Sequence, residues 1–147
     1  MSDKVNPSSK EGERAILCSI LENSKILDDV SAYLRKDYFY FQENSRLYEI
    51  LCNMYLNQEP VDVVTVCGRL TEKDKRDGVD PYFITGIMNS PTSNPLYYAK
   101  QVYEKYLLRN VINKTALIND SAYSNNTDVY NLMSDAHTAI GALIEIK

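Results

Sequence analysis

The chain has 147 residues, enough for a domain that buries a hydrophobic core of its own. Hydrophobic residues make up 44% and charged residues 24%, which excludes a disordered or collagen-like chain. Sixteen basic against 20 acidic residues give a formal net charge of −4, and this sign excludes a protein that binds nucleic acid over its whole surface.

Glycine and proline, five of each, are too few for the turns of an all-β chain of this length. We therefore expect an all-α fold in one structural domain, with a globular helical head over 9–93 and a C-terminal helical hairpin over 94–147. Residues 1–8 show no periodicity and are expected to form a disordered arm. Three cysteines, with neither a leader nor a long apolar run, favour a cytoplasmic location and no membrane partner.

The head begins with two predicted helices, over about 10–22 and 26–34. Ser9 is the expected N-cap of the first, because acidic residues and then apolar residues at helical spacing follow it. The aromatic run 37–41 is interpreted as a corner between helices. A third helix is predicted over about 44–56, since the polar residues before Pro60 end it.

Short segments complete the head. Asp62 is the predicted N-cap of a fourth helix over 63–70. Residues 71–79 have no apolar side chain before the last position and are expected to form a solvated loop. Asp80 followed by proline predicts a short fifth helix over about 80–88.

The hairpin starts at Asn94, where an N-cap followed by proline again predicts a helix, here over about 95–123. Thr127 or Asp128 is expected to cap a last helix. The apolar stripe expected to pack this helix onto the long one comprises Val129, Leu132, Met133, Ala136, Ile140, Leu143 and Ile144.

Both hairpin helices carry more apolar surface than one partner helix can cover. A second face of the long helix holds Leu108, Ile112 and Ala116, and three residues lie off the stripe of the last helix, namely Ala139, Ala142 and Ile146. This second face can pack either on the chain's own head or on a second copy of the chain. We expect the second copy, which would build a four-helix bundle from two hairpins, and predict that these six residues form the dimer interface.

The charges of the two helices favour their pairing. The long helix is net positive, with Lys100, Lys105, Arg109 and Lys114 against Glu104. The last helix is net negative, with Asp128, Asp135 and Glu145 against Lys147.

The sequence predicts no catalytic, cofactor-binding or metal site. Its glycines are scattered singly without the Lys-Ser or Lys-Thr of a phosphate-binding loop, so the chain is not expected to bind or hydrolyse ATP. Three cysteines and one histidine, Cys18, Cys52, Cys67 and His137, are enough ligands for a zinc site. Their spacing in the sequence is not that of zinc ligands, so we do not expect such a site. The cysteines sit beside apolar residues, where they fit a core role better.

Several motifs, in order over about 100 residues, give the chain a family resemblance. They are Glu13-Arg14-Ala15-Ile16-Leu17 with Ile20-Leu21, Asp37-Tyr38-Phe39 before Leu47-Tyr48, Val61-Asp62-Val63-Val64-Thr65-Val66 with Leu70, Asn94-Pro95 with Tyr98-Ala99 and Val102, and Arg109 before Val111-Ile112. In these motifs the chain resembles the N-terminal domain of the DnaB family of replicative DNA helicases.

The departures from the family pattern indicate a divergent member. Cys18 stands where the family often has glycine, Asn44 lies near a family histidine, and Gly78 is single where the family has a pair. The ATPase part of the family is absent from these 147 residues, so the chain is either a domain cut from a longer helicase or a free-standing relative.

The resemblance implies a collar domain. In the family, hairpins of neighbouring subunits pair, six copies form a trimer of dimers on the hexamer, and the collar docks primase and helps control loading. DNA strand separation, with ATP and Mg²⁺, belongs to the motor domain of the family, so this chain by itself would be no enzyme. It would contact DNA only weakly or indirectly. A helicase loader is a further possible partner. The alternative is a free-standing regulator, an inhibitor or loader of a replicative helicase.

Overall fold

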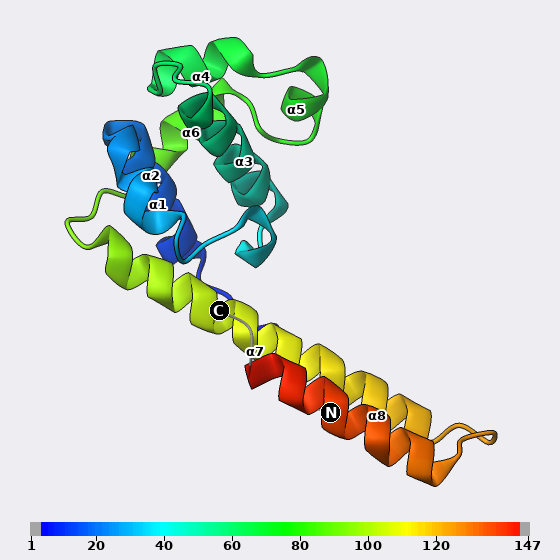
Figure 1. Ribbon diagram of the computed structural model, residues 1–147. Helices are drawn as coiled ribbons and strands as arrows, with labels where there is room; N and C mark the ends of the chain where they lie inside the picture. Colours follow the sequence, from blue (N-terminus) through cyan, green and yellow to red (C-terminus); the bar gives the residue numbers. More distant parts are fainter. Residues whose placement is uncertain (1–3, 145–147) are drawn as a thin grey trace. The chain divides into compact units, whose positions relative to one another are not determined.

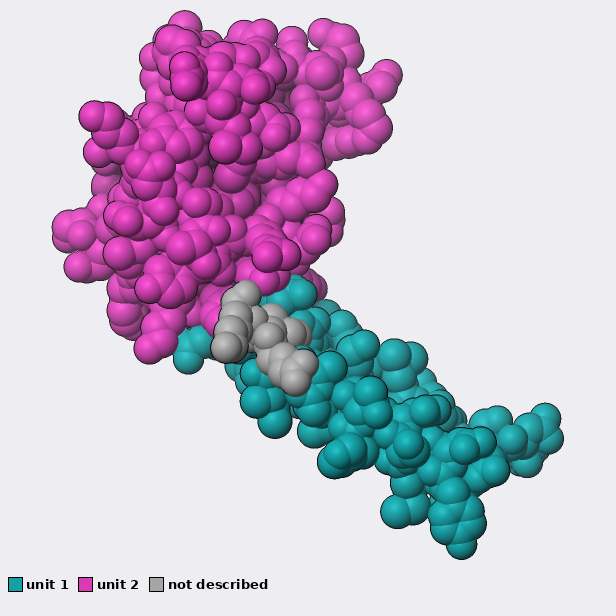
Figure 2. Space-filling view, in the orientation of Figure 1, with its two compact units in different colours: residues 1–7, 104–147 teal, residues 8–103 magenta. Residues whose placement is uncertain are grey.

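A computed structural model describes residues 4–144 of the chain. Eight α-helices and two short 3₁₀-helices account for the regular structure of these residues, which contain no strand (Figure 1). The all-α prediction is therefore confirmed. The chain divides into two compact units: unit 2 is Ser8–Tyr103, and unit 1 is Met1–Pro7 with Glu104–Lys147 (Figure 2). The division falls further along the chain than the Asn94 from which the sequence analysis starts the hairpin.

Helix α1, Lys10–Glu22, has the predicted bounds and forms the centre of unit 2. Ser9 caps it by accepting a hydrogen bond from the Gly12 amide at 3.1 Å. A Cβ atom at Gly12 would lie 2.6 Å from the Ser9 hydroxyl oxygen, so any larger residue here would displace the hydroxyl that caps α1. Ile16, Leu17 and other residues of α1 are fully buried.

The second predicted helix is shorter than expected. The structure has a 3₁₀-helix η1, Ser24–Ile26, then α2, Leu27–Val30, and residues 31–33 form a turn in place of further helix. The amides of Ala32 and Tyr33 donate to carbonyls three residues back, at 3.3 and 3.0 Å, which tightens the chain and ends α2. A second 3₁₀-helix, η2, Lys36–Tyr38, opens the aromatic corner.

Helix α3, Gln42–Leu56, crosses the core of unit 2, where Leu47, Leu51 and Met54 are buried. No side chain at its own N-cap position, Phe41, caps it. A carboxylate from α1 fixes the segment that enters α3, because Glu13 accepts hydrogen bonds from the amides of Tyr40 and Phe41, which precede the helix.

Three short helices follow. Asp62 caps α4, Val63–Arg69, through a capping box with Thr65. The expectation of a solvated loop over 71–79 is wrong, because α5, Glu72–Arg76, lies within it. A second capping box, between Thr71 and Asp74, starts α5. Asp80 caps α6, Pro81–Ile87, as predicted.

Two long helices complete the chain. Helix α7, Pro95–Ala122, begins in unit 2 and continues into unit 1. Helix α8, Val129–Ile144, follows a turn in which the Asp128 carboxylate accepts from the amides of Tyr130 at 2.9 Å and Asn131 at 3.2 Å. The two helices run side by side in opposite directions, as the predicted hairpin requires (Figure 1). Of the predicted interface, Ile146 lies outside the described residues.

Candidate functional site

The hairpin of α7 and α8 has no core of its own. Between residues 104 and 144, which the structure describes without a gap, no residue is buried. All the buried residues of α7, Ala99 and Val102, precede this stretch. A pair of helices in water is stabilised by the apolar surface that it covers. In this hairpin much of the apolar side-chain surface remains exposed to water and contributes no such stabilisation.

The half-buried residues show which faces of the two helices meet. On α7 they include Leu107 and Ile118. On α8 they are Leu132, Ala136, Ala139 and Leu143, spaced three or four residues apart along one face. These residues form the seam of the hairpin.

Beside this seam, both helices expose large apolar side chains. On α7, Leu108, Val111 and Ile112 are 48%, 42% and 43% exposed. On α8, Met133, Ile140 and Ile144 are 64%, 41% and 80% exposed. Successive residues turn by about 100° around each helix, and the helices are antiparallel, so both sets fall on the same side of the hairpin. We call these six residues the hairpin apolar face.

The structure spreads the predicted interface residues over several positions. Leu108 and Ile112 lie together on the hairpin apolar face. Ala116 is exposed, Ala142 is exposed on the other flank of α8, and Ala139 is half-buried in the seam. Their role in a dimer interface stays a prediction.

Sequence reasoning missed four members of the face. Met133, Ile140 and Ile144 were expected to pack onto the long helix, yet each is more than two-fifths exposed, and Val111, which the sequence analysis did not assign to the uncovered face, is 42% exposed. The apolar residues of α8 extend around more of the helix than one partner can cover, and the sequence does not show which part of that arc α7 takes. The only sign of this exposure in the sequence is the wide arc that the apolar residues occupy around α8.

The charges on the hairpin are arranged unequally. Between residues 104 and 122, α7 carries Lys105, Arg109 and Lys114 against Glu104 and Asp120, whereas α8 and its cap carry Asp128 and Asp135. Arg109 is fixed in place, because its Nη1 donates to the carbonyl of Pro7 at 2.7 Å and its guanidinium lies 5.9 Å from the centre of the Tyr106 ring.

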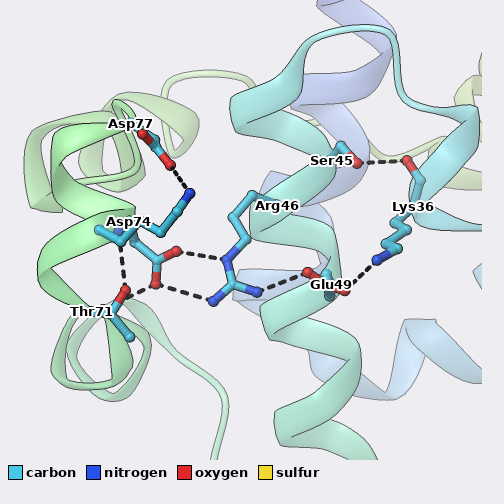
Figure 3. Close-up of polar contacts among 8 residues, drawn as sticks. Lys36, Ser45, Arg46, Glu49, Thr71, Asp74 and Asp77 are labelled. Atoms are coloured by element: carbon cyan, nitrogen blue, oxygen red, sulfur yellow. Dashed lines mark hydrogen bonds and ion pairs between the residues drawn. The ribbon is translucent and has the colours of Figure 1, made fainter.

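An ion-pair network in unit 2 fastens α5 to α3 (Figure 3). Arg46 donates from Nε to Asp74 Oδ1 at 2.7 Å and from Nη2 to Asp74 Oδ2 at 3.2 Å, and its Nη1 donates to Glu49 at 2.8 Å. Lys36 also pairs with Glu49, at 2.6 Å. The Arg46 guanidinium lowers the pKa of Asp74 to about 2, so the pair stays ionised at neutral pH. Every member has a fixed partner, which suits a structural role better than proton transfer.

A cavity of about 400 Å³ opens between the α2 region and α3. Its lining includes Leu27, Leu34, Tyr48, Cys52 and Leu56. The Tyr48 hydroxyl donates to the Leu34 carbonyl at 3.0 Å, and burial raises the pKa of both Tyr48 and Cys52. Both groups are thus held protonated. The two carboxylates of the lining are engaged as well, Asp28 with the Tyr55 hydroxyl and Glu49 with Lys36 and Arg46, so the lining suits packing better than proton transfer.

The remaining candidate ligands do not assemble. Burial raises the pKa of Cys18 to about 11, and its thiol donates to Glu22 at 3.2 Å, which fits a packed residue. Within residues 4–144 no three of the histidine, cysteine, aspartate and glutamate side chains are grouped so that they could hold a metal ion. None of the helices described is both long enough and apolar enough to cross a membrane.

Comparison with known proteins places the chain among helicase domains. The family model for the DnaB-like helicase N terminal domain matches residues 5–104. The chain is 34% identical over 150 residues to the replicative DNA helicase DnaC of Bacillus subtilis, and the match covers 100% of the chain and 33% of that protein. The chain thus spans about a third of the length of this curated relative.

Two solved structures resemble the fold. The N-terminal domain of DnaB helicase from Mycobacterium tuberculosis has a TM-score of 0.84 at 25% identity, over 94% of this chain and 99% of that one. The N-terminal domain of DnaB helicase from Helicobacter pylori, described together with its interactions with primase, has a TM-score of 0.68 at 20% identity, over 78% and 91% of the two chains.

Proposed function

Because the chain belongs to the family of DnaB-like helicase N-terminal domains, we propose that it is the collar domain of a hexameric replicative DNA helicase. In this role it pairs neighbouring subunits through the hairpin and docks primase or a helicase loader. The observation that carries the proposal is the hairpin itself, which buries no residue between 104 and 144 and exposes the six large side chains of the hairpin apolar face.

A second copy of the chain is the occupant that fits the hairpin apolar face best. An isologous contact lays the same face of each copy against the other, so two exposed faces disappear in one contact. The net positive α7 stretch and the negative α8 of one copy complement α8 and α7 of the other. Two hairpins packed in this way form a four-helix bundle.

Docking of primase is supported by the fold and by no particular residue of this chain. A domain of the same fold, from Helicobacter pylori, is described with its interactions with primase. Direct strand binding by this chain is disfavoured by its net charge of −4. A calorimetric titration with the primase of the same organism tests this part of the proposal, and no binding at about 10 µM would remove it.

The chemistry of unwinding is assigned to the rest of the helicase. The chain spans about a third of its Bacillus subtilis relative and has no phosphate-binding loop. We therefore expect ATP and Mg²⁺ to bind outside these 147 residues. ATP turnover by the purified chain in the presence of Mg²⁺ would contradict this assignment.

The pairing surface is tested by the substitution Ile112→Asp. A carboxylate buried without a partner in the interface costs about 3 kcal/mol or more, which weakens the dimer at least about 100-fold. The matched control is Asn113→Asp, since Asn113 is exposed and points away from the hairpin apolar face. Sedimentation velocity over a concentration series, with helicity checked by circular dichroism, measures both variants.

Three results are possible for Ile112→Asp. A weakened dimer with unchanged helicity, next to an unaffected control, supports the proposal. Loss of helicity would assign Ile112 to the core of its own chain, and a dimer as stable as the wild type would place this residue in solvent. Either of the last two results contradicts pairing through this face.

A further inference from the structure

A groove follows one face of α3 in unit 2. The cavity of about 400 Å³ beside this helix is lined by Tyr48, Cys52, Tyr55 and Leu56, and a second cavity of about 560 Å³ is lined by Tyr55 and Leu56 again. Because the two cavities share these residues, they adjoin and form one groove, which we call the α3 groove. From Tyr48 to Leu56 the helix rises about 12 Å, at about 1.5 Å per residue.

The centre of the α3 groove is apolar. Leu27 and Leu34, each 2% exposed, form the buried part of its lining. Leu56, the last residue of α3, borders both cavities and is 77% exposed. An exposed leucine beside a buried apolar lining leaves surface that an apolar side chain of a ligand can cover. The volume of the first cavity lies in the range of binding clefts, about 300–1,000 Å³.

The acidic side chains of the α3 groove already have partners. Asp28 accepts a hydrogen bond from a tyrosine hydroxyl at 2.9 Å. Glu49 pairs with Lys36 at 2.6 Å (Figure 3). In the second cavity, Glu59 forms an ion pair with an arginine of α4. These carboxylates therefore do not call for a cation from a ligand.

Two basic side chains of the groove have no such partner. Arg35 lines the first cavity and Lys25 lines the second. In the part of the chain that the structure describes, neither the Arg35 guanidinium nor the Lys25 ammonium forms a hydrogen bond or an ion pair. Both side chains are exposed, so a carboxylate of a ligand can reach them. The groove thus combines an apolar centre with one unpaired positive charge at each cavity.

From this arrangement we infer that the α3 groove binds a short segment of a partner protein in which large apolar side chains are flanked by aspartate or glutamate. The apolar side chains of the segment pack against Leu56, and its carboxylates pair with Arg35 and Lys25. A length of about 12 Å fits two turns of a helix whose apolar side chains are three and four residues apart. The inference goes beyond the proposed function, because the groove lies in unit 2 and contains no residue of the hairpin.

The test measures the binding of labelled synthetic peptides of about 12 residues to the whole chain by fluorescence anisotropy. The acidic peptide carries leucines three and four residues apart and glutamate elsewhere, and a second peptide has lysine in place of every glutamate. We expect the acidic peptide to bind with a dissociation constant of about 100 µM or lower, and the lysine peptide to bind at least about tenfold more weakly. Calorimetry with octanoate, a carboxylate on an apolar chain, provides the small-molecule comparison.

Substitutions in the groove separate its apolar and charged parts. Leu56→Gln removes the exposed apolar side chain and should weaken binding of the acidic peptide at least about tenfold. Arg35→Gln and Lys25→Gln each remove one charge and should weaken it about 2- to 5-fold. The matched controls are Val64→Gln, since Val64 is 80% exposed on α4, and Lys100→Gln, an exposed lysine of α7; neither residue lines the groove. Circular dichroism checks helicity, and Leu56→Ala replaces the glutamine variant should that one lose it.

The inference predicts that the acidic peptide binds the wild-type chain, that the groove variants weaken this binding and that the controls leave it unchanged. Absence of binding, equal binding of the lysine peptide, or wild-type affinity of Leu56→Gln would overturn it. Binding of octanoate without the acidic peptide would assign the groove to a small molecule and also overturns it. A weaker dimer of Leu56→Gln in sedimentation would make the groove a contact between copies of the chain, with the same consequence. None of these results replaces the Ile112→Asp test, which decides the proposed function separately.

Discussion

The Glu13 side chain links two helices of unit 2, and its removal gives a quantitative test of the fold. The carboxylate is 1% exposed. It accepts hydrogen bonds from the amides of Tyr40 at 2.8 Å and Phe41 at 3.4 Å, and from Nδ2 of Asn44 at 3.0 Å. A carboxylate of α1 thus holds the two residues that lead into α3 and the Asn44 side chain of its first turn.

The substitution Glu13→Ala leaves these donors without their acceptor inside the protein. Each unsatisfied buried donor costs about 1–3 kcal/mol, so we expect a loss of about 3–5 kcal/mol in the free energy of unfolding. Glu13→Gln keeps one acceptor oxygen and should cost less. The control is Glu11→Ala in the same first turn, where the exposed carboxylate contributes only about 0.5 kcal/mol through the helix dipole.

Urea denaturation followed by far-UV circular dichroism measures these differences. The expected order of stability is wild type and Glu11→Ala together, then Glu13→Gln, then Glu13→Ala. A Glu13→Ala protein within about 0.5 kcal/mol of the wild type would refute the argument that this carboxylate holds the start of α3 in place.

Two further predictions concern unit 2. The pKa of Asp74 is lowered from 3.8 to about 2 by Arg46, so this pair stabilises the fold fully above about pH 4 and loses that contribution as pH falls toward 2. In acid titrations followed by circular dichroism, Asp74→Asn should be less stable at neutral pH and should lack this part of the pH dependence; an unchanged acid transition would contradict the assignment. Gly12→Ala should lower the melting temperature, because the added Cβ would meet the Ser9 hydroxyl at 2.6 Å, whereas Gly68→Ala, with open space around it, should raise it by removing a helix-interior glycine. Equal shifts for the two variants would show that the Ser9 contact is unimportant.

Local rules predicted much of the fold. Ser9, Asp62 and Asp80 cap the helices that the sequence assigned to them. The family resemblance seen in the motifs from Glu13 to Val102 is confirmed by the match over residues 5–104. Caps, periodicity and short motifs depend on residues close in the chain, which is why a single sequence reveals them.

Where several signals competed, the sequence analysis was less successful. The highly charged segment 71–79 was expected to be a loop, although Thr71 and Asp74 have the spacing of a capping box. The Asp74 carboxylate also meets Arg46, 28 residues earlier, and this pairing holds α5 against α3. Such distant partners leave no local pattern, and the same is true of Glu13 and Tyr40.

The candidate site shows the same limit. The hairpin and its surplus of apolar residues could be predicted, because both follow from helical periodicity. Which flank of α8 remains exposed depends on how α7 packs against it, and the structure leaves Met133 and Ile144 outside. For that reason the tests of pairing use Ile112, which the sequence and the structure both place on the second, uncovered face of α7.

The central claim is that the hairpin apolar face pairs with a second copy of the chain. Sedimentation equilibrium of the wild-type chain at about pH 8, over a range of concentrations, tests it most directly. The monomer mass is 16.8 kDa, and the account predicts a concentration-dependent rise to twice this mass. A mass of 16.8 kDa at every concentration up to about 100 µM would contradict it.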